Sequence, residues 1–375
     1  MNISVDARGA NLYKGSGIGT YIENLLKEII NLDNINKYTI FWSGENYSNF
    51  KKSNTSIHLT SKKHGNFYES FYYSSYTNNN NIDLHHIPQN GIGLNSNYQC
   101  PCVVTIHDLI PYLMPETVGK GYLERFLKDM PFIIEKTKGI LTVSEYSKKD
   151  ILRFFPNYPA DNIFVTPLAA NSSFIKLDKA NCKSILKNKY NIDNPFVLYI
   201  GGFSSRKNVK ELITSFKKIN TSLNNSDYRL VLCGSVKDEG NKLINYCKEI
   251  GIYENIIFTG FVPDEDLPLF YNASDTFVYP SLYEGFGLPP LEAMSCGTPV
   301  ITSNLTSIPE VCNDSAILIN PFNKDELADS LLKLLNSNSL RDEFSIKGFE
   351  NSKNFTWQKT AKLTLDAYEK INNID

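Results

Sequence analysis

The 375-residue sequence has no excess of basic residues, no CxxC cysteine pair and no long apolar run. Lysine and arginine number 38 against 40 acidic residues, and this balance gives no indication of a nucleic-acid-binding protein. The seven cysteines are scattered, and Cys100 and Cys102 are too closely spaced for a zinc ribbon. This cysteine pattern predicts a reduced, cytoplasmic protein. No apolar run approaches ~18 residues and the N-terminus enters a strand at once, so we expect neither a signal peptide nor a membrane span.

The length is sufficient for two domains, each with its own core. In both halves, short apolar runs alternate with segments of helical periodicity, which predicts two doubly wound α/β domains. We place the N-terminal domain at residues 1–170 and the C-terminal domain at 171–356, followed by a last helix at about 357–375.

The most informative stretch is 279–297, YPSLYEGFGLPPLEAMSCG. It predicts a strand end, a glycine-rich loop and a helix whose first turn tolerates the proline pair. Glycines such as Gly287 let a ligand approach the backbone, and a helix N-terminus favours anions, so we expect Glu292 to stay ionised. An ionised carboxylate accepts two neighbouring hydroxyls, so Glu292 suits a ribose diol and Glu284 suits hydroxyls of a second sugar.

A second glycine loop, GGFSSRKN at 201–208, lies between a buried apolar strand and a helix. Arg206 can bind phosphate oxygens through two parallel hydrogen bonds, and Lys207 supplies a compact charge. Two basic residues before a helix are unremarkable alone. Together with the glutamates, at strand ends of one sheet, they indicate a pocket for a sugar joined to a nucleotide.

The N-terminal half contains a weaker glycine loop and one candidate histidine. The loop Gly15-Ser-Gly-Ile-Gly19 precedes a helix at about 20–30, but no acidic residue closes the strand at 38–42, so it only partly resembles a dinucleotide fingerprint. His107 follows the strand at 103–106, where α/β sheets carry ligand groups, although a capping role is the alternative. Ser144 is better explained as an ordinary helix cap.

The segment 66–76, NFYESFYYSSY, is dense in aromatic residues. The helical spacing of Phe67, Phe71 and Tyr72 favours a place in the core. A rim of tyrosines that binds an acceptor or lipid is the alternative. The charged and apolar segment 121–138 predicts an amphipathic helix, either on a membrane-facing side or on a solvated face.

The segment 279–297 resembles the E-x7-E signature of glycosyltransferase family 4, retaining enzymes of the GT-B architecture with two Rossmann-like domains facing a cleft. The continuation TPVIT at 298–302 and IPE at 308–310 is similar to that family too, as are most of the C-terminal half and several spots in the N-terminal half. The resemblance implies that the last helix packs back on the N-terminal domain. It implies catalytic roles for Glu284, Arg206, Lys207 and His107. It implies donor contacts at Glu292, Gly17, Gly202, Val262, Phe286, Gly287 and Leu288.

The resemblance also implies a metal-independent reaction without a cofactor, because the Arg206/Lys207 pair neutralises the leaving diphosphate. The acidic run Asp264-Glu-Asp266 is similar to the DxD metal motif of the other glycosyltransferase fold. We interpret it instead as the start of a helix, where acidic residues complement the helix dipole.

Short segments such as SVDARG near the start and TPLA at 166–169 are most similar to bacterial mannosyltransferases of surface polysaccharide (O-antigen or capsule) assembly. This resemblance favours GDP-mannose as donor, with a UDP-sugar as the alternative. The implied acceptor is a lipid-linked oligosaccharide at the inner face of the plasma membrane, with possible peripheral membrane contact and no nucleic-acid partner.

Three other classes stay open. A retaining glycoside hydrolase would use Glu284 and Glu292 as its two carboxyls, ~5 Å apart, but would leave Arg206 and Lys207 without a role. A nucleotide-sugar epimerase of the same architecture would need no acceptor. A non-catalytic binding module is the weakest of the three.

Overall fold

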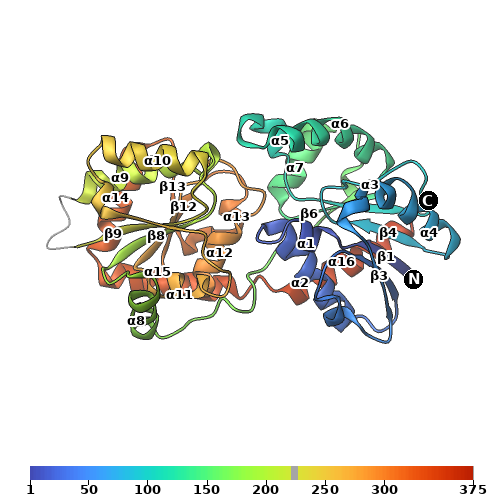
Figure 1. Cartoon of the computed structure of the whole chain (residues 1–375), viewed down its shortest axis with the longest axis horizontal. Coiled ribbons are helices and arrows are strands. Elements are labelled where there is room, and N and C mark those ends of the chain that lie inside the picture. Colours follow the sequence, from blue (N-terminus) through green and yellow to red (C-terminus); the bar gives the residue numbers. More distant parts are fainter. Residues whose placement is uncertain (221–226, 375) are drawn as a thin grey trace. The chain divides into compact units, whose positions relative to one another are not determined.

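The computed structural model describes residues 1–220 and 227–374, which form two compact units (Figure 1). The first comprises Met1–Ala169 with Phe355–Asp375, and the second comprises Ala170–Asn354. The limits expected from the sequence, 170 and 356, lie next to these ends. Both units are doubly wound α/β, as predicted.

The first unit contains a parallel sheet of seven strands in the order β3-β2-β1-β4-β5-β6-β7. Strands β4 and β5 are buried at every position, in agreement with their position between neighbours on both sides. The strands are β1 (Asn2–Asp6), β2 (Lys37–Trp42), β3 (Thr55–Leu59), β4 (Leu84–Ile87), β5 (Cys102–Ile106), β6 (Gly139–Thr142) and β7 (Ile163–Val165).

Helices cover this sheet, and the last helix of the chain is one of them. The hydroxyl of Tyr368 in α16 lies 2.7 Å from Nδ1 of His86, and Nε2 of His86 lies 2.8 Å from Oγ1 of Thr105. The buried histidine therefore has partners on both nitrogens and joins α16 to the sheet. The helices are α1 (Gly9–Leu12), α2 (Gly17–Leu32), α3 (Gly65–Phe67), α4 (Tyr73–Asn79), α5 (Ile110–Leu113), α6 (Lys120–Lys136), α7 (Glu145–Phe154) and α16 (Trp357–Asn372).

The expected core position of the aromatic segment is wrong for Phe67 and Phe71, whose side chains are 53% and 59% exposed. Between α3 and α4 the chain makes a π-helical turn at Tyr68–Tyr72. A π turn takes more residues than an α turn and shifts the inward face, so Tyr73 is buried instead.

The second unit contains a parallel sheet of six strands in the order β10-β9-β8-β11-β12-β13. The strand order reverses between β8 and β11, which makes that pair the topological switch point of the sheet. The strands are β8 (Phe196–Ile200), β9 (Arg229–Cys233), β10 (Ile256–Gly260), β11 (Thr276–Tyr279), β12 (Val300–Ser303) and β13 (Ile317–Ile319). The helices are α8 (Lys179–Tyr190), α9 (Val209–Asn220), α10 (Asp238–Glu249), α11 (Leu267–Ala273), α12 (Leu288–Ser295), α13 (Ile308–Cys312), α14 (Lys324–Leu335) and α15 (Asn338–Ser352).

Ligands of open α/β sheets bind at the carboxyl ends of the strands beside the switch point. In the second unit these ends carry the glycine loop at 201–208 and the loop before α12, the two segments singled out in the sequence. Within the described residues, no helix combines the length and the apolar character that crossing a bilayer requires.

Candidate active site

The loops that follow β8 and β11 are joined to each other by hydrogen bonds. The backbone N–H of Leu282 donates to the carbonyl of Arg206 at 2.8 Å, and Oγ of Ser281 lies 3.3 Å from the same carbonyl oxygen. Because both loops begin at neighbouring strands, these two contacts fix the position of Arg206 relative to the glutamate segment.

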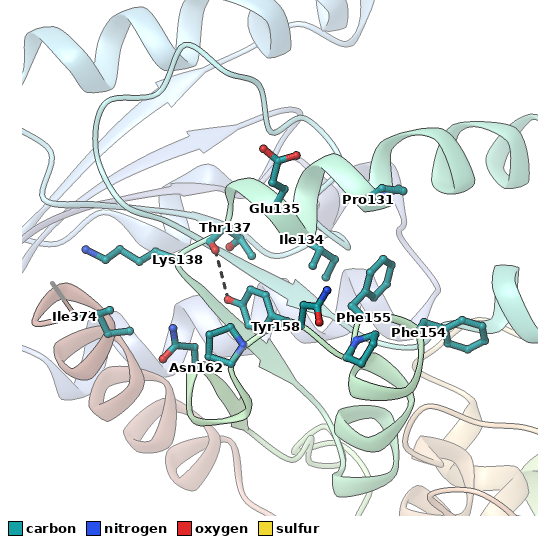
Figure 2. Close-up of a pocket in the computed structure, with 13 residues that line it drawn as sticks. Pro131, Ile134, Glu135, Thr137, Lys138, Phe154, Phe155, Tyr158, Asn162 and Ile374 are labelled. Atoms are coloured by element: carbon teal, nitrogen blue, oxygen red, sulfur yellow. Dashed lines mark hydrogen bonds between the residues drawn. The ribbon is translucent and has the colours of Figure 1, made fainter.

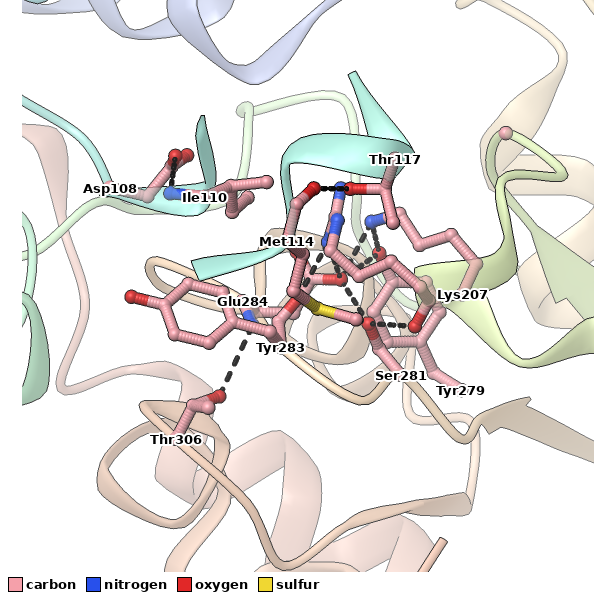
Figure 3. A network of polar contacts seen from close by, with 12 residues as sticks. Asp108, Ile110, Met114, Thr117, Lys207, Tyr279, Ser281, Tyr283, Glu284 and Thr306 are labelled. Atoms are coloured by element: carbon pink, nitrogen blue, oxygen red, sulfur yellow. Dashed lines mark hydrogen bonds and ion pairs between the residues drawn. The ribbon is translucent and has the colours of Figure 1, made fainter. Parts of the chain in front are cut away.

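The carboxylate of Glu284 binds both cations of the glycine loop (Figure 3). Its Oε1 lies 2.9 Å from Nη1 of Arg206 and 2.6 Å from Nζ of Lys207. The hydroxyls of Ser281 and Tyr279 donate to the same oxygen at 2.5 and 3.1 Å. Three functional residues expected from the sequence therefore meet at one atom.

The charge of Glu284 follows from these contacts. Burial acts to raise its pKa, but Lys207 and then Arg206 outweigh that effect and lower the pKa to about 2. Glu284 is therefore ionised at neutral pH, and it neutralises part of the positive charge of the loop.

The backbone around Glu284 is also held in place. Nη1 of Arg206 donates to the carbonyl of Tyr283 at 2.5 Å, and the N–H of Glu284 donates to Oγ1 of Thr306 at 3.1 Å. Oγ of Ser307 lies 2.9 Å from the carbonyl oxygen of Glu284. With both its backbone and its carboxylate bonded, Glu284 is held rigidly between the two loops.

An aromatic stack lies beneath the cations. The rings of Tyr279 and Tyr199 are stacked with centroids 5.9 Å apart, and Phe203 continues the stack at 6.1 Å from Tyr199. Nζ of Lys207 lies 4.9 Å from the centroid of the Tyr279 ring and donates to its hydroxyl. A cation–π contact and a hydrogen bond thus orient the ammonium group of Lys207.

The glycines of the site differ in what surrounds them. A Cβ added to Gly202 would meet no protein atom within 4 Å, so the backbone at Gly202 is open to a ligand. Gly287 precedes α12 with φ +112°, and an added Cβ would lie 2.6 Å from Cδ1 of Ile308. Gly287 is thus required by the turn itself, and its predicted donor contact is additional to this structural role.

The expectation that Glu292 stays ionised near the helix N-terminus is wrong. Because α12 already begins at Leu288, Glu292 lies beyond the first turn, and its Oε2 accepts a hydrogen bond of 3.0 Å from the Tyr271 hydroxyl. Burial raises the pKa of Glu292 to about 8; Tyr271 opposes this shift and Asp264 adds to it. Glu292 is therefore largely protonated at neutral pH.

The remaining predicted donor contacts lie around these loops. Phe286 is buried, and its carbonyl accepts a 2.8 Å hydrogen bond from Ser307. Leu288 is half-buried at the start of α12. Val262 is buried just after β10.

The interpretation of the acidic run 264–266 as the start of a helix is wrong, because α11 begins only at Leu267 and has no acidic residue in its first turn. Asp266 is the N-cap of that helix, although its side chain does not cap it. Its Oδ2 accepts 2.5 Å from Nζ of Lys189 and a short hydrogen bond from the hydroxyl of Tyr190. These contacts give Asp266 a structural role in the second unit.

In the first unit, His107 lies at the carboxyl end of β5. Its Nε2 is 2.9 Å from the carbonyl of Pro88, and burial lowers its pKa to about 4. A carbonyl only accepts, so the neutral ring carries its hydrogen on Nε2. Ser144 caps α7, as expected, by accepting from the N–H of Ser147 at 3.0 Å, and the Ser147 hydroxyl donates to the His107 carbonyl at 3.2 Å.

Gly17 is exposed as the first residue of α2, which begins three residues earlier than the sequence predicted (about 20). Ser16 caps the helix and accepts from the N–H of Gly19 at 3.4 Å. An added Cβ on Gly17 would meet nothing within 4 Å. This loop follows β1, which with β4 forms the switch point of the first sheet.

Sequence reasoning missed a buried ion network at the same sheet edge. Arg8, 4% exposed, binds Asp6 through Nε–Oδ1 at 2.7 Å and Nη2–Oδ2 at 2.6 Å. Its Nη1 donates to Oε1 of Glu69 at 3.1 Å, and Oε2 of Glu69 accepts from Arg125 at 2.7 Å. The segment SVDARG contains Asp6 and Arg8, but Glu69 and Arg125 are distant in sequence and no local pattern indicates them.

A pocket of the first unit lies at the amino ends of its strands, opposite to the carboxyl ends where a ligand is predicted (Figure 2). Its volume is about 560 Å³, and its lining includes Lys138, just before β6, and Asn162, just before β7. The Tyr158 hydroxyl donates to the Thr137 carbonyl there at 3.4 Å. Since these are the amino ends of the strands, this pocket is separate from the predicted ligand edge.

Comparison with known proteins shows the family of the chain. The family model "Glycosyl transferases group 1" matches residues 183–351, which include both loops. O-antigen chain mannosyltransferase B of Escherichia coli is 39% identical over 269 residues, covering 71% of this chain and 70% of that protein. The chain belongs to the glycosyl transferases group 1 family.

This glycosyltransferase has a second close relative in a larger protein. The serotype-specific mannosyltransferase WbdA of Escherichia coli is 31% identical over 273 residues, which cover 72% of this chain but 33% of that protein. The chain thus matches about a third of that relative's length.

The fold is that of known GT-B glycosyltransferases. Sucrose-phosphate synthase from Thermosynechococcus elongatus superimposes with a TM-score of 0.76 over 99% of both chains, at 19% identity. At this identity the likeness concerns the architecture alone. It confirms the two Rossmann-like sheets predicted from the sequence.

Proposed function

We propose that this glycosyltransferase moves a mannosyl group from GDP-mannose to a hydroxyl of a lipid-linked oligosaccharide, with retention at the anomeric carbon, in surface polysaccharide synthesis. The observation that carries the proposal is the convergence of Arg206 and Lys207 on Glu284 at the switch point of the second sheet. The choice of mannose is supported by the two relatives at 39% and 31% identity, both of which are named mannosyltransferases.

The diphosphate of the donor would bind at the loop that contains Gly202. The guanidinium of Arg206 and the ammonium of Lys207 are preorganised there, and the open space at Gly202 admits a ligand close to the backbone. Fixed positive charge that stabilises a leaving diphosphate lowers the barrier without reorganisation during the reaction. The proposed reaction therefore uses no metal ion or other cofactor.

The two carboxylate oxygens of Glu284 would have different roles in the proposed reaction. Oε1 accepts hydrogen bonds from both cations, whereas Oε2 makes no hydrogen bond among the described residues. Oε2 is therefore the oxygen that would accept a hydroxyl of the transferred sugar. A neutral His107 would contribute a hydrogen bond rather than a proton, because its pKa of about 4 leaves it uncharged.

For the chemical step we propose the front-face route. The bond between the anomeric carbon and the leaving phosphate oxygen breaks, the acceptor oxygen bonds to that carbon from the same face, and the acceptor proton passes to the departing phosphate. The GDP formed keeps the electron pair. This route requires no carboxylate nucleophile, and Glu284, bonded to two cations, is poorly suited to be one.

The hydrolase alternative is disfavoured for the same reason. A retaining hydrolase needs one free carboxylate nucleophile and one carboxylic acid at ~5 Å. The pKa values of the two glutamates, about 2 and about 8, would suit such a pair. However, the hydrolase would have no use for Arg206 and Lys207, and Glu284 is already neutralised by them.

The proposed acceptor determines where the protein works. A lipid-linked oligosaccharide stays at the membrane surface, so we propose a cytoplasmic protein in peripheral contact with the inner face of the plasma membrane. A UDP-hexose remains the second donor candidate, because none of the contacts described above distinguishes guanine from uracil; Val262 is the residue expected to lie next to the base.

The experiment that tests the proposal is a transfer assay. Purified protein is incubated with labelled GDP-mannose or UDP-glucose and membranes that contain lipid-linked oligosaccharides. We expect label in the organic phase from GDP-mannose only, and an α-mannosyl product by NMR, since the donor is the α-anomer. Release of free mannose without transfer would support the hydrolase, and labelling from UDP-glucose would change the donor.

A further inference from the structure

Two exposed phenylalanines form an apolar ridge on the first unit. Phe67 and Phe71 are 53% and 59% exposed, and their ring centroids lie 5.9 Å apart. On the opposite side of the same helical segment, Tyr73 packs on Phe41 with centroids 4.4 Å apart. The segment is thus firmly attached to the sheet through its inner face, while its outer face presents two large apolar side chains to solvent.

A basic hollow adjoins this ridge. Lys62, Lys63, His64 and Phe67 line a depression of about 350 Å³. All four side chains are exposed. Lysine ammonium groups around a hollow next to an aromatic edge match the chemistry of an anionic lipid, which has a phosphate headgroup above an apolar chain.

The surrounding chain carries almost no negative charge. Residues 51–82 contain four lysines, at 51, 52, 62 and 63, and one acidic residue, Glu69. The carboxylate of Glu69 binds Arg8 at 3.1 Å and Arg125 at 2.7 Å. The only acid of this stretch is therefore neutralised by two arginines, and it does not line the basic hollow.

We propose that the ridge Phe67/Phe71 and the hollow Lys62–His64 form a docking surface for an anionic lipid bilayer. The lysines bind lipid phosphates, and the two phenyl rings enter the boundary between headgroups and acyl chains. The inference deepens the proposed function, on which it rests for its purpose, because an enzyme that glycosylates a lipid-linked acceptor must stay at the membrane surface. The binding itself requires no catalysis.

The test is sedimentation of the full chain with vesicles of phosphatidylglycerol and phosphatidylethanolamine, with phosphatidylcholine vesicles for comparison. We expect binding to the anionic vesicles that weakens as salt increases. The variant Lys62→Glu/Lys63→Glu should lose affinity on the order of 25-fold, given about fivefold per lysine at an anionic surface. Phe67→Ser/Phe71→Ser should lose on the order of 100-fold, given about tenfold per inserted ring.

A matched control changes one apolar and one basic residue elsewhere. Ile346 is 62% exposed and is followed by Lys347 on α15 of the second unit. The variant Ile346→Ser/Lys347→Glu should bind vesicles as the parent does. Phe67→Trp should retain binding and report insertion through a blue shift of its emission with anionic vesicles only.

Two results would overturn the docking surface. One is equal sedimentation of the parent with anionic and phosphatidylcholine vesicles, and the other is unchanged vesicle binding by both double variants. Titration of GDP into the same proteins separates this outcome from a failure of the proposed function. Vesicle binding without any GDP binding would refute the donor assignment and leave the docking surface intact.

Discussion

Replacing Glu284 by glutamine tests the reasoning about the cation cluster most sharply. Glutamine retains the size of the side chain and removes its charge. The pKa of Glu284, about 2 against an ordinary 4.5, corresponds to about 3 kcal/mol of net stabilisation of the ionised form by its partners. Arg206 and Lys207, whose side chains are 14% and 13% exposed, would remain buried without their counter-ion.

We therefore expect Glu284→Gln to lower the free energy of unfolding of the second unit by about 3 kcal/mol. In a domain of this size the change corresponds to a Tm decrease of about 10 °C. The diphosphate of GDP supplies the missing negative charge, so GDP should raise Tm more in the variant than in the parent. Guanosine, which has no phosphate, should not. Mannosyl transfer should be abolished.

The assay is scanning calorimetry of both proteins alone, with GDP and with guanosine. The control is Glu343→Gln, which removes a 49%-exposed carboxylate paired with Lys347 and should cost less than about 1 kcal/mol. The reasoning is refuted if Glu284→Gln unfolds at the parent's Tm. It is equally refuted if the destabilised variant gains no more from GDP than the parent does.

Four further substitutions test the roles of Glu292, Arg206, Gly202 and Gly287. Glu292, with a pKa of about 8, must lose its proton to accept a ribose diol, so GDP binding near pH 7 should release up to one proton. Calorimetry in buffers of different ionisation enthalpy measures the number of protons released. The variant Glu292→Gln should release none. Because its folded pKa is raised, the contribution of Glu292 to stability is complete below about pH 4.5 and is lost as pH rises through about 8. The folded pKa of Glu284 is lowered, so its contribution is present above about pH 4.5 and is lost as pH falls through about 2. The Glu292→Gln variant should therefore show a smaller decline in Tm toward pH 8. Arg206→Ala should weaken GDP about 10- to 100-fold and guanosine hardly at all in parallel titrations, and equal GDP affinity would refute the phosphate assignment. Gly202→Ala, with open space around it, should fold normally but bind GDP less tightly, whereas Gly287→Ala should lose about 1–3 kcal/mol of stability because its Cβ meets Ile308 at 2.6 Å.

The architecture and the main cluster could be predicted from local sequence. Unbroken apolar runs indicated the buried parallel strands, and the two glycine loops followed strands β8 and β11. Because neighbouring parallel strands end at one sheet edge, Arg206, Lys207 and Glu284 had to come close together, and the structure places all three at one carboxylate oxygen.

The protonation of Glu292 could not be predicted in this way. Its environment is formed by Tyr271, from the preceding helix, and by burial that depends on the packing of α11 and α12. A local pattern indicated only a glutamate close to the start of a helix. The helix begins at Leu288, so Glu292 is its fifth residue and lies beyond the first turn.

The orientation of the aromatic segment was mispredicted for a geometric reason. The spacing of Phe67 and Phe71 fits one face of an α-helix, but the chain forms a π-helical turn there, and the inward face passes to Tyr73. Glu69, held by Arg8 and Arg125, lies within that turn. Contacts between residues this far apart in sequence are not visible in a local pattern.

The measurement that tests the central claim most directly is calorimetric titration of the protein with GDP and with UDP, side by side and without added metal. A GDP-mannose-dependent transferase whose phosphate site is Arg206 and Lys207 should bind GDP tightly, bind UDP weakly, and lose GDP binding in Arg206→Ala. Preferential binding of UDP would contradict the choice of donor. Binding of neither nucleotide would contradict the assignment of the site itself.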